Sequence, residues 1–182
     1  MTNIKDKLKS THDKVIPKLF IEDPVTQEKL VFFDFPFATL KHRIWVKNME
    51  GTKLLYIRAK KLIQTRSQTG FFWVSQDLNA EEDYDVNSPR FLGELSLKSI
   101  FSIHRFQFTS ADGILLFSIK RDVWKKEFRF ENHKLPGSPI LAEASKLWMK
   151  FFMEVNLHIN PSCDRMTRLL IICCLVTLLH RD

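Results

Sequence analysis

The chain has 182 residues, a hydrophobic fraction of 45% and a formal net charge of +7. This length suits a single domain, and five glycines and seven prolines are too few for a collagen-like or low-complexity chain. The 16 phenylalanines favour β structure, because aromatic residues are enriched in strands.

The first 18 residues differ from the rest of the chain. Their apolar positions fall at helical spacing with lysines between them: Ile4, Leu8, Thr11 and Val15. The pattern predicts a mobile basic arm over 1–18, with a short amphipathic helix as the alternative. The segment lacks the apolar core of a secretory signal.

From residue 19 onward, short aromatic-rich runs alternate with turn residues. They predict hairpins over 19–35, 42–59, 101–121 and 122–148, and single strands over 71–74, 91–97 and 151–159. A strand, a turn that contains glycine and a second strand recur, as in RIWVKNMEGTKLLYI and RFQFTSADGILLFSI. Repeated hairpins of this kind favour an all-β barrel or sandwich.

The run LLIICCLVTLL over 169–179 is the most hydrophobic stretch. As a helix it would span about 16 Å, which is short of a bilayer core of about 30 Å. It is apolar on every side, so it predicts a helix over 164–180 that protein surrounds and that Ser162 or Asp164 caps. Membrane contact and a strand are the alternatives. The residues expected in this core helix are Leu169, Leu170, Ile171, Ile172, Cys173, Leu175, Val176, Leu178 and Leu179.

The three cysteines lie near the C-terminus, and two of them are adjacent. Their spacing does not resemble a zinc site. Together with the absence of a signal, they favour a reduced, intracellular location, in the cytoplasm or at the cytoplasmic face of a membrane.

Charge is unevenly placed. Residues 41–66 carry eight Lys or Arg against one acid, residues 71–94 carry six acids against one Arg, and residues 118–134 carry six bases against three acids. Such polarised surfaces suit an anionic partner.

Two basic clusters are candidates for binding anionic phospholipid headgroups. Their members are Lys41, Arg43, Lys60, Lys61 and Arg66 in the first cluster, and Lys120, Arg121, Trp124, Lys125, Lys126 and Arg129 in the second. Tryptophan prefers the headgroup level of a bilayer, and each cation near an anionic surface contributes about 1 kcal/mol. Solvated loops or a protein partner are the alternatives. Nucleic acid is not an expected partner, because the aromatic residues alternate along strands and would point inward rather than stack on bases.

The sequence offers no enzymatic motif. It contains no glycine-rich phosphate loop, G-x-S-x-G or H-E-x-x-H, and its six histidines share no ligand spacing. Asp77, Asn79 and Glu81 match the first positions of a calcium loop, but Glu82 stands where glycine is needed. We expect neither an enzyme nor a cofactor.

Several segments resemble a known family. FQFTSADGILLFSI, FLGEL with Gly93, ILAEASKLW with Ser145, Lys146 and Trp148, and VNLHINPSCDRMTRLLIICCLVTLL are similar in order and spacing to segments of the phospholipid scramblase and LURP-one-related proteins of the Tubby C-terminal-like superfamily. The resemblance covers about 25–182. It implies a closed antiparallel barrel of about twelve strands around a central hydrophobic C-terminal helix, with residues 19–182 as the barrel domain.

The resemblance also implies a membrane-associated protein that binds anionic phospholipids and aids their movement between leaflets. The alternative is a soluble interaction or scaffold module without lipid activity. Scramblases carry a calcium-binding acidic stretch before the terminal helix, whereas here only Glu154, Asn156 and Asp164 offer side-chain oxygens. A hard cation wants six or more oxygen ligands, so the resemblance suggests calcium but the ligand set matches it poorly.

Overall fold

A computed structural model of the chain describes residues 2–6, 18–22, 29–34, 43–59, 68–74, 85–98, 104–122, 124–125, 127–132, 139–148 and 153–180. Within these ranges the chain forms twelve strands followed by one helix. The strands are β1 (Thr2–Asp6), β2 (Lys18–Glu22), β3 (Lys29–Asp34), β4 (Arg43–Asn48), β5 (Lys53–Ala59), β6 (Thr69–Trp73), β7 (Phe91–Leu97), β8 (Arg105–Ser110), β9 (Leu115–Asp122), β10 (Glu127–Glu131), β11 (Ile140–Trp148) and β12 (Met153–Ile159). The helix is α1 (Arg165–His180).

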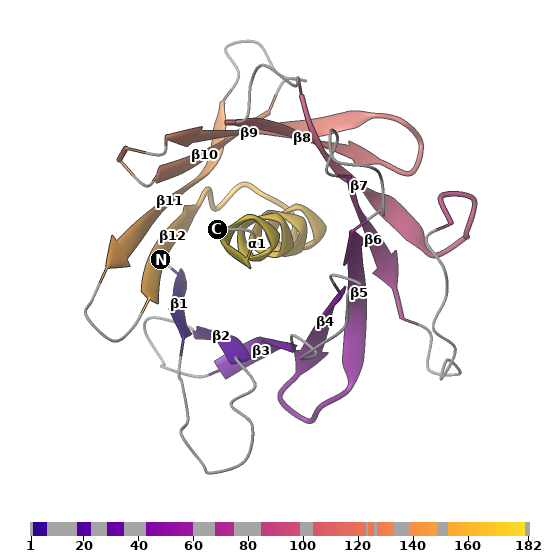
Figure 1. Cartoon of the computed structure of the whole chain (residues 1–182), viewed down its shortest axis with the longest axis horizontal. Helices are drawn as coiled ribbons and strands as arrows, with labels where there is room; N and C mark the ends of the chain where they lie inside the picture. The colour runs from indigo at the N-terminus through magenta and orange to yellow at the C-terminus, as the bar shows by residue number, and fades with distance from the viewer. Residues whose placement is uncertain are drawn as a thin grey trace.

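Each strand from β2 to β12 pairs antiparallel with its neighbours in the sequence. β1 pairs with both β2 and β12, so the order of strands closes into a barrel. Figure 1 shows α1 inside the ring of strands, with the C-terminal end of the chain at its centre. A tight antiparallel order of this kind needs only short connections.

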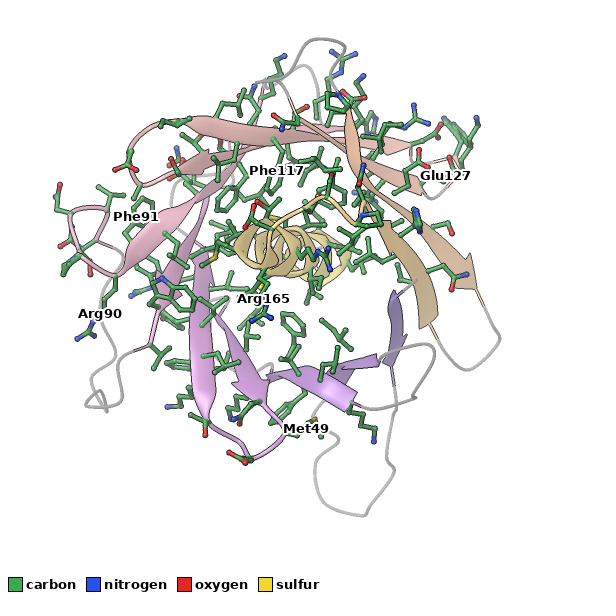
Figure 2. The ribbon with its side chains drawn as sticks, turned by 180° about the vertical axis from the view of Figure 1, so that it is seen from behind. Met49, Arg90, Phe91, Phe117, Glu127 and Arg165 are labelled. Carbon is green, nitrogen blue, oxygen red and sulfur yellow. The ribbon has the colours of Figure 1, made fainter. Side chains whose placement is uncertain are left out.

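Side chains alternate between the interior of the barrel and its outer face, as the two-residue period of strands requires. The largest interior side chains are almost wholly inaccessible: Phe33, Phe71, Phe108, Phe117 and Phe130. Four of them, Phe71, Phe108, Phe117 and Phe130, form a chain of three ring contacts in this order, with centroids 5.1 to 5.9 Å apart. Figure 2 shows Phe117 inside the ring and Glu127 at its periphery.

α1 fills the centre of this aromatic shell. Leu170, Ile171 and every residue from Cys173 to Leu179 are buried, while Leu169 and Ile172 are partly buried and pack against the same core. Its apolar side chains belong to one cluster with the interior residues of the strands. One buried hydroxyl, that of Thr177, donates to the carbonyl oxygen of Cys173 at 2.7 Å, which satisfies it within the helix.

The start of α1 is fixed by side chains. Asp164 accepts a hydrogen bond from the backbone N–H of Thr167 at 2.9 Å and another from its hydroxyl at 2.6 Å, as an N-cap residue does. These bonds lower the pKa of the Asp164 carboxyl. Arg168 donates to the carbonyl oxygens of Cys163 and Pro161 and holds the preceding turn.

The prediction of an all-β chain that ends in a helix is confirmed, and the helix begins one residue later than expected. The expected hairpins are present as β2–β3, β4–β5, β8–β9 and β10–β11. The prediction of an arm or helix over 1–18 is wrong for Thr2–Asp6, which form a strand. The physical reason is that β2 and β12 each offer an unpaired backbone edge, which β1 satisfies.

Candidate functional site

The β9–β10 turn presents the most exposed aromatic side chain of the described residues. Asp122 Oδ1 accepts hydrogen bonds from the backbone N–H groups of Trp124 and Lys125, both at 3.0 Å. This arrangement, in which an aspartate bonds the backbone just after it, fixes a tight turn. Trp124, at the tip of the turn, is 95% exposed, and Lys125 beside it is also exposed.

An open groove of about 930 Å³ lies beside this turn and is lined by residues of β8 to β12. Its basic lining residues are Arg105, Lys120, Arg121, Lys125 and Arg129, and its acidic ones are Asp122, Glu127 and Glu143. His104 and His158 also line it. The groove is therefore lined by charges of both signs, with more basic than acidic side chains.

Cross-strand register places the charged residues of the groove in a row. Lys120 lies between Arg105 of β8 and Arg129 of β10, and Glu143 lies between Arg129 and His158. Residues directly opposite on neighbouring strands have Cβ atoms about 5 Å apart. The first three positions of the row are thus adjacent cations.

Two of these cations are ion-paired. Lys120 Nζ lies 2.8 Å from Glu131 Oε1, and Arg129 Nε lies 3.0 Å from Glu143 Oε1. Both side chains of the Arg129–Glu143 pair are about half exposed, so water and salt screen the pair and it contributes little to stability. Glu131 is largely buried, so its carboxylate has lost most of its hydration. Lys120 compensates for that loss by placing a positive charge beside it.

Arg121 is placed differently from the other cations. It lies opposite Phe128 in the β9–β10 ladder, with its guanidinium carbon 5.8 Å from the centre of that ring. Phe128 is buried in the core, so Arg121 is held against the apolar interior at the end of the barrel. Its backbone N–H donates to the carbonyl oxygen of His104 at 2.8 Å, which links the turn to the start of β8.

The structure thus brings together Lys120, Arg121, Trp124, Lys125 and Arg129 of the second predicted cluster. Lys126 lies outside the described residues, as do Lys41, Lys60, Lys61 and Arg66 of the first cluster. Of Arg43 the structure describes the backbone, which pairs with Arg58. The acidic loop with Asp77, Asn79 and Glu81 also lies outside the described residues.

Sequence patterns missed four residues of the groove region: Arg105, Glu131, Glu143 and His158. Each lies on a different strand from the residue that it faces or pairs with. Only the register of the strands brings them to the second cluster, and no local motif signals that register.

The described residues were also compared with the ligand sets of metal ions. No group of three or more His, Cys, Asp or Glu in the described ranges could hold a metal ion. Two of the residues considered for calcium are therefore in different places. Asn156 lies in the middle of β12 and lines the groove, whereas Asp164 follows the end of β12 and caps α1. Cys163, Cys173 and Cys174 are buried, and burial raises the pKa of the Cys163 and Cys173 thiols.

Among the described helical residues, no helix is both long and apolar enough to cross a membrane.

The fold is that of an all-β protein whose antiparallel strands surround a C-terminal helix. It is similar to an X-ray structure of a protein from Arabidopsis thaliana, with a TM-score of 0.60 and 13% sequence identity over 99% of this chain and 90% of that one. At this identity the likeness shows a shared fold. No protein-family model and no curated protein matches the sequence.

Proposed function

We propose that this protein binds anionic phospholipid surfaces through the groove and the β9–β10 turn, as the resemblance to scramblase and LURP-one-related proteins implies. The observation that carries the proposal is the presentation of Trp124 at 95% exposure beside Lys125 and above a groove with five basic side chains.

The chemistry of the turn fits a bilayer interface. Tryptophan is favoured at headgroup level because one end of its ring system is apolar and the N–H is polar. Lysine side chains beside it would meet lipid phosphates and carboxylates as mobile point charges. The rigid turn that Asp122 makes presents both side chains with little loss of backbone freedom on binding. The cytoplasmic leaflet is an anionic surface of this kind.

Lipid movement between leaflets stays a separate prediction. It would require a hydrophobic path, and the most apolar segment, α1, is buried in the barrel. Exposing α1 would uncover the core that it fills. The proposal is therefore limited to surface binding.

Vesicle flotation with the purified chain tests the proposal. We expect binding to vesicles that contain phosphatidylserine, none to neutral phosphatidylcholine, and loss of binding at high salt, because the contacts would be screened. Trp124→Ala should weaken binding by about tenfold, the value of one large apolar side chain. Ile114→Ala removes an apolar side chain that is 46% exposed at another turn and should bind like the unmodified chain.

A scaffold module without lipid activity is the second candidate. The ion pairs of Lys120 and Arg129 favour it, since these cations already have carboxylate partners. Failure to bind any vesicle at low salt would refute lipid binding and favour a protein partner at Trp124.

A further inference from the structure

The outer face of β8 to β10 carries its charged side chains in two neighbouring rows. The first row holds the three adjacent cations Arg105, Lys120 and Arg129. The second row holds Asp122 and Glu127, which lie directly opposite each other on β9 and β10. Each acid is two residues from a cation on its own strand, so both rows lie on the same face of the sheet. All five side chains are exposed and line the groove.

The acidic pair of the second row is electrostatically unfavourable. Residues directly opposite on neighbouring strands have Cβ atoms about 5 Å apart, and like charges at such positions are destabilising. Lys120 and Arg129 do not relieve this repulsion, because their ion pairs are made with Glu131 and Glu143. Within the described ranges neither Asp122 nor Glu127 has an ion-pair partner. A ligand cation between the two carboxylates would therefore be attracted by both.

The spacing of the rows defines the kind of ligand that can use both. Two residues along a strand rise by about 7 Å, which is the distance between the rows. A matching ligand carries an anionic group for the first row and a cationic group a few atoms away for the second. The headgroup of phosphatidylserine has this form, because two carbon atoms separate its phosphate oxygen from its ammonium nitrogen.

Neutral polar residues continue the second row. Ser145 lies opposite Glu127, and Asn156 lies opposite Ser145. Both side chains line the groove, and a hydroxyl and an amide can each donate a hydrogen bond to a carboxylate. The serine headgroup carries a carboxylate next to its ammonium group, so these two residues suit the remaining charged group of the ligand.

From these two rows we infer that the groove selects phosphatidylserine among anionic phospholipids. The cations of the first row would bind the phosphate, and Asp122 and Glu127 would bind the ammonium group. The inference rests on the proposed function and adds the identity of the headgroup. The groove volume of about 930 Å³ lies within the range of about 300–1,000 Å³ typical of small-ligand sites, so there is room for a headgroup to enter.

Phosphatidylglycerol is the discriminating competitor. It has the same net charge as phosphatidylserine, but hydroxyl groups replace the ammonium and the carboxylate. A surface that responds to charge alone would bind both lipids equally. In the groove, phosphatidylglycerol would leave the repulsion between Asp122 and Glu127 uncompensated.

Flotation with vesicles of phosphatidylcholine and equal fractions of either anionic lipid tests the selection at low salt. We expect binding to phosphatidylserine vesicles to be about fivefold tighter, the upper value for one exposed ion pair. Equal binding to both lipids would overturn the selection and leave the binding of anionic surfaces in place. Binding to neither lipid would refute the proposed function, and the selection with it.

Glu127→Gln and Asp112→Asn form a matched pair of variants. Each neutralises one exposed carboxylate, and Asp112 lies in the β8–β9 turn, away from the groove lining. In Glu127→Gln the preference for phosphatidylserine should fall below about twofold, because an amide does not neutralise the ammonium group. Asp112→Asn should keep the fivefold preference. A preference retained in Glu127→Gln, or lost equally in both variants, would contradict binding of the ammonium group by the acidic pair.

Thermal unfolding gives a readout that needs no lipid. Because Glu127→Gln removes the repulsion between two opposed carboxylates, its melting temperature should equal or exceed that of the unmodified chain. The same measurement shows that the variant is folded in the flotation assay. A lower melting temperature would mean that Glu127 has a stabilising partner and would overturn its assignment to the ligand.

Discussion

Replacing Ile171 tests whether α1 is the core of the barrel. Ile171 has no exposed surface and contacts the buried strand residues. Truncation to alanine removes buried methyl and methylene groups and leaves a cavity, which costs about 2–5 kcal/mol. For a chain of this length we expect the melting temperature of Ile171→Ala to fall by about 4–20 °C.

Ile171→Asp should be more damaging. It adds to the same cavity a carboxyl group without a partner, at a cost of several further kcal/mol whether the group stays charged or takes up a proton. Domains are stable by about 5–15 kcal/mol, so the two terms together consume most or all of the stability. We expect Ile171→Asp to lack a cooperative unfolding transition.

Circular dichroism during heating and urea titration measures both variants. The control is Ile114→Asp, the same substitution at a residue that is 46% exposed in the β8–β9 turn, which should change the free energy of unfolding by about 0.5 kcal/mol or less. If Ile171→Asp melted like the unmodified chain, α1 would not be the core, and a helix that leaves the barrel to enter a membrane would become the better explanation.

Three further predictions follow from the fold. A Cβ at Gly93, where φ is +153°, would lie 2.3 Å from the backbone oxygen of Thr109, so Gly93→Ala should lower the urea midpoint far more than Gly51→Ala, whose Cβ would meet open space. Because burial raises the pKa of Cys173 and encloses the other two thiols, no cysteine should react with Ellman's reagent at pH 8 until urea unfolds the chain, and rapid native reaction would argue against the buried helix. The Asp164 cap should contribute about 0.5–2 kcal/mol at pH 7; since its pKa is lowered on folding, the stability lost in Asp164→Ala should shrink as pH falls below about 4, and a pH-independent difference would contradict the cap.

The parts of the fold that could be predicted are those in which local pattern and tertiary environment agree. The run 169–179 is apolar on all sides and too short to span a bilayer, so an interior position was the simplest solution, and α1 occupies it. The β4–β5 and β8–β9 hairpins were visible because Gly51 and Gly113 supply the positive φ values that their turns require.

The first strand could not be predicted because its side chains carry no strand signal. TNIKD contains one apolar residue, Ile4, and the lysines that follow suggested a solvated arm. What makes Thr2–Asp6 a strand is backbone pairing with Glu22 and its neighbours on one side and with β12 on the other. That demand exists only once the other strands have formed the ring.

The ion pairs of the site could not be predicted from the sequence either. Lys120 and Glu131 are 11 residues apart and Arg129 and Glu143 are 14 apart, and their pairing depends on register. An irregularity in the β10–β11 ladder between Phe130 and Glu131 shifts that register by local geometry. A cluster counted as basic along the sequence is therefore partly neutralised in space.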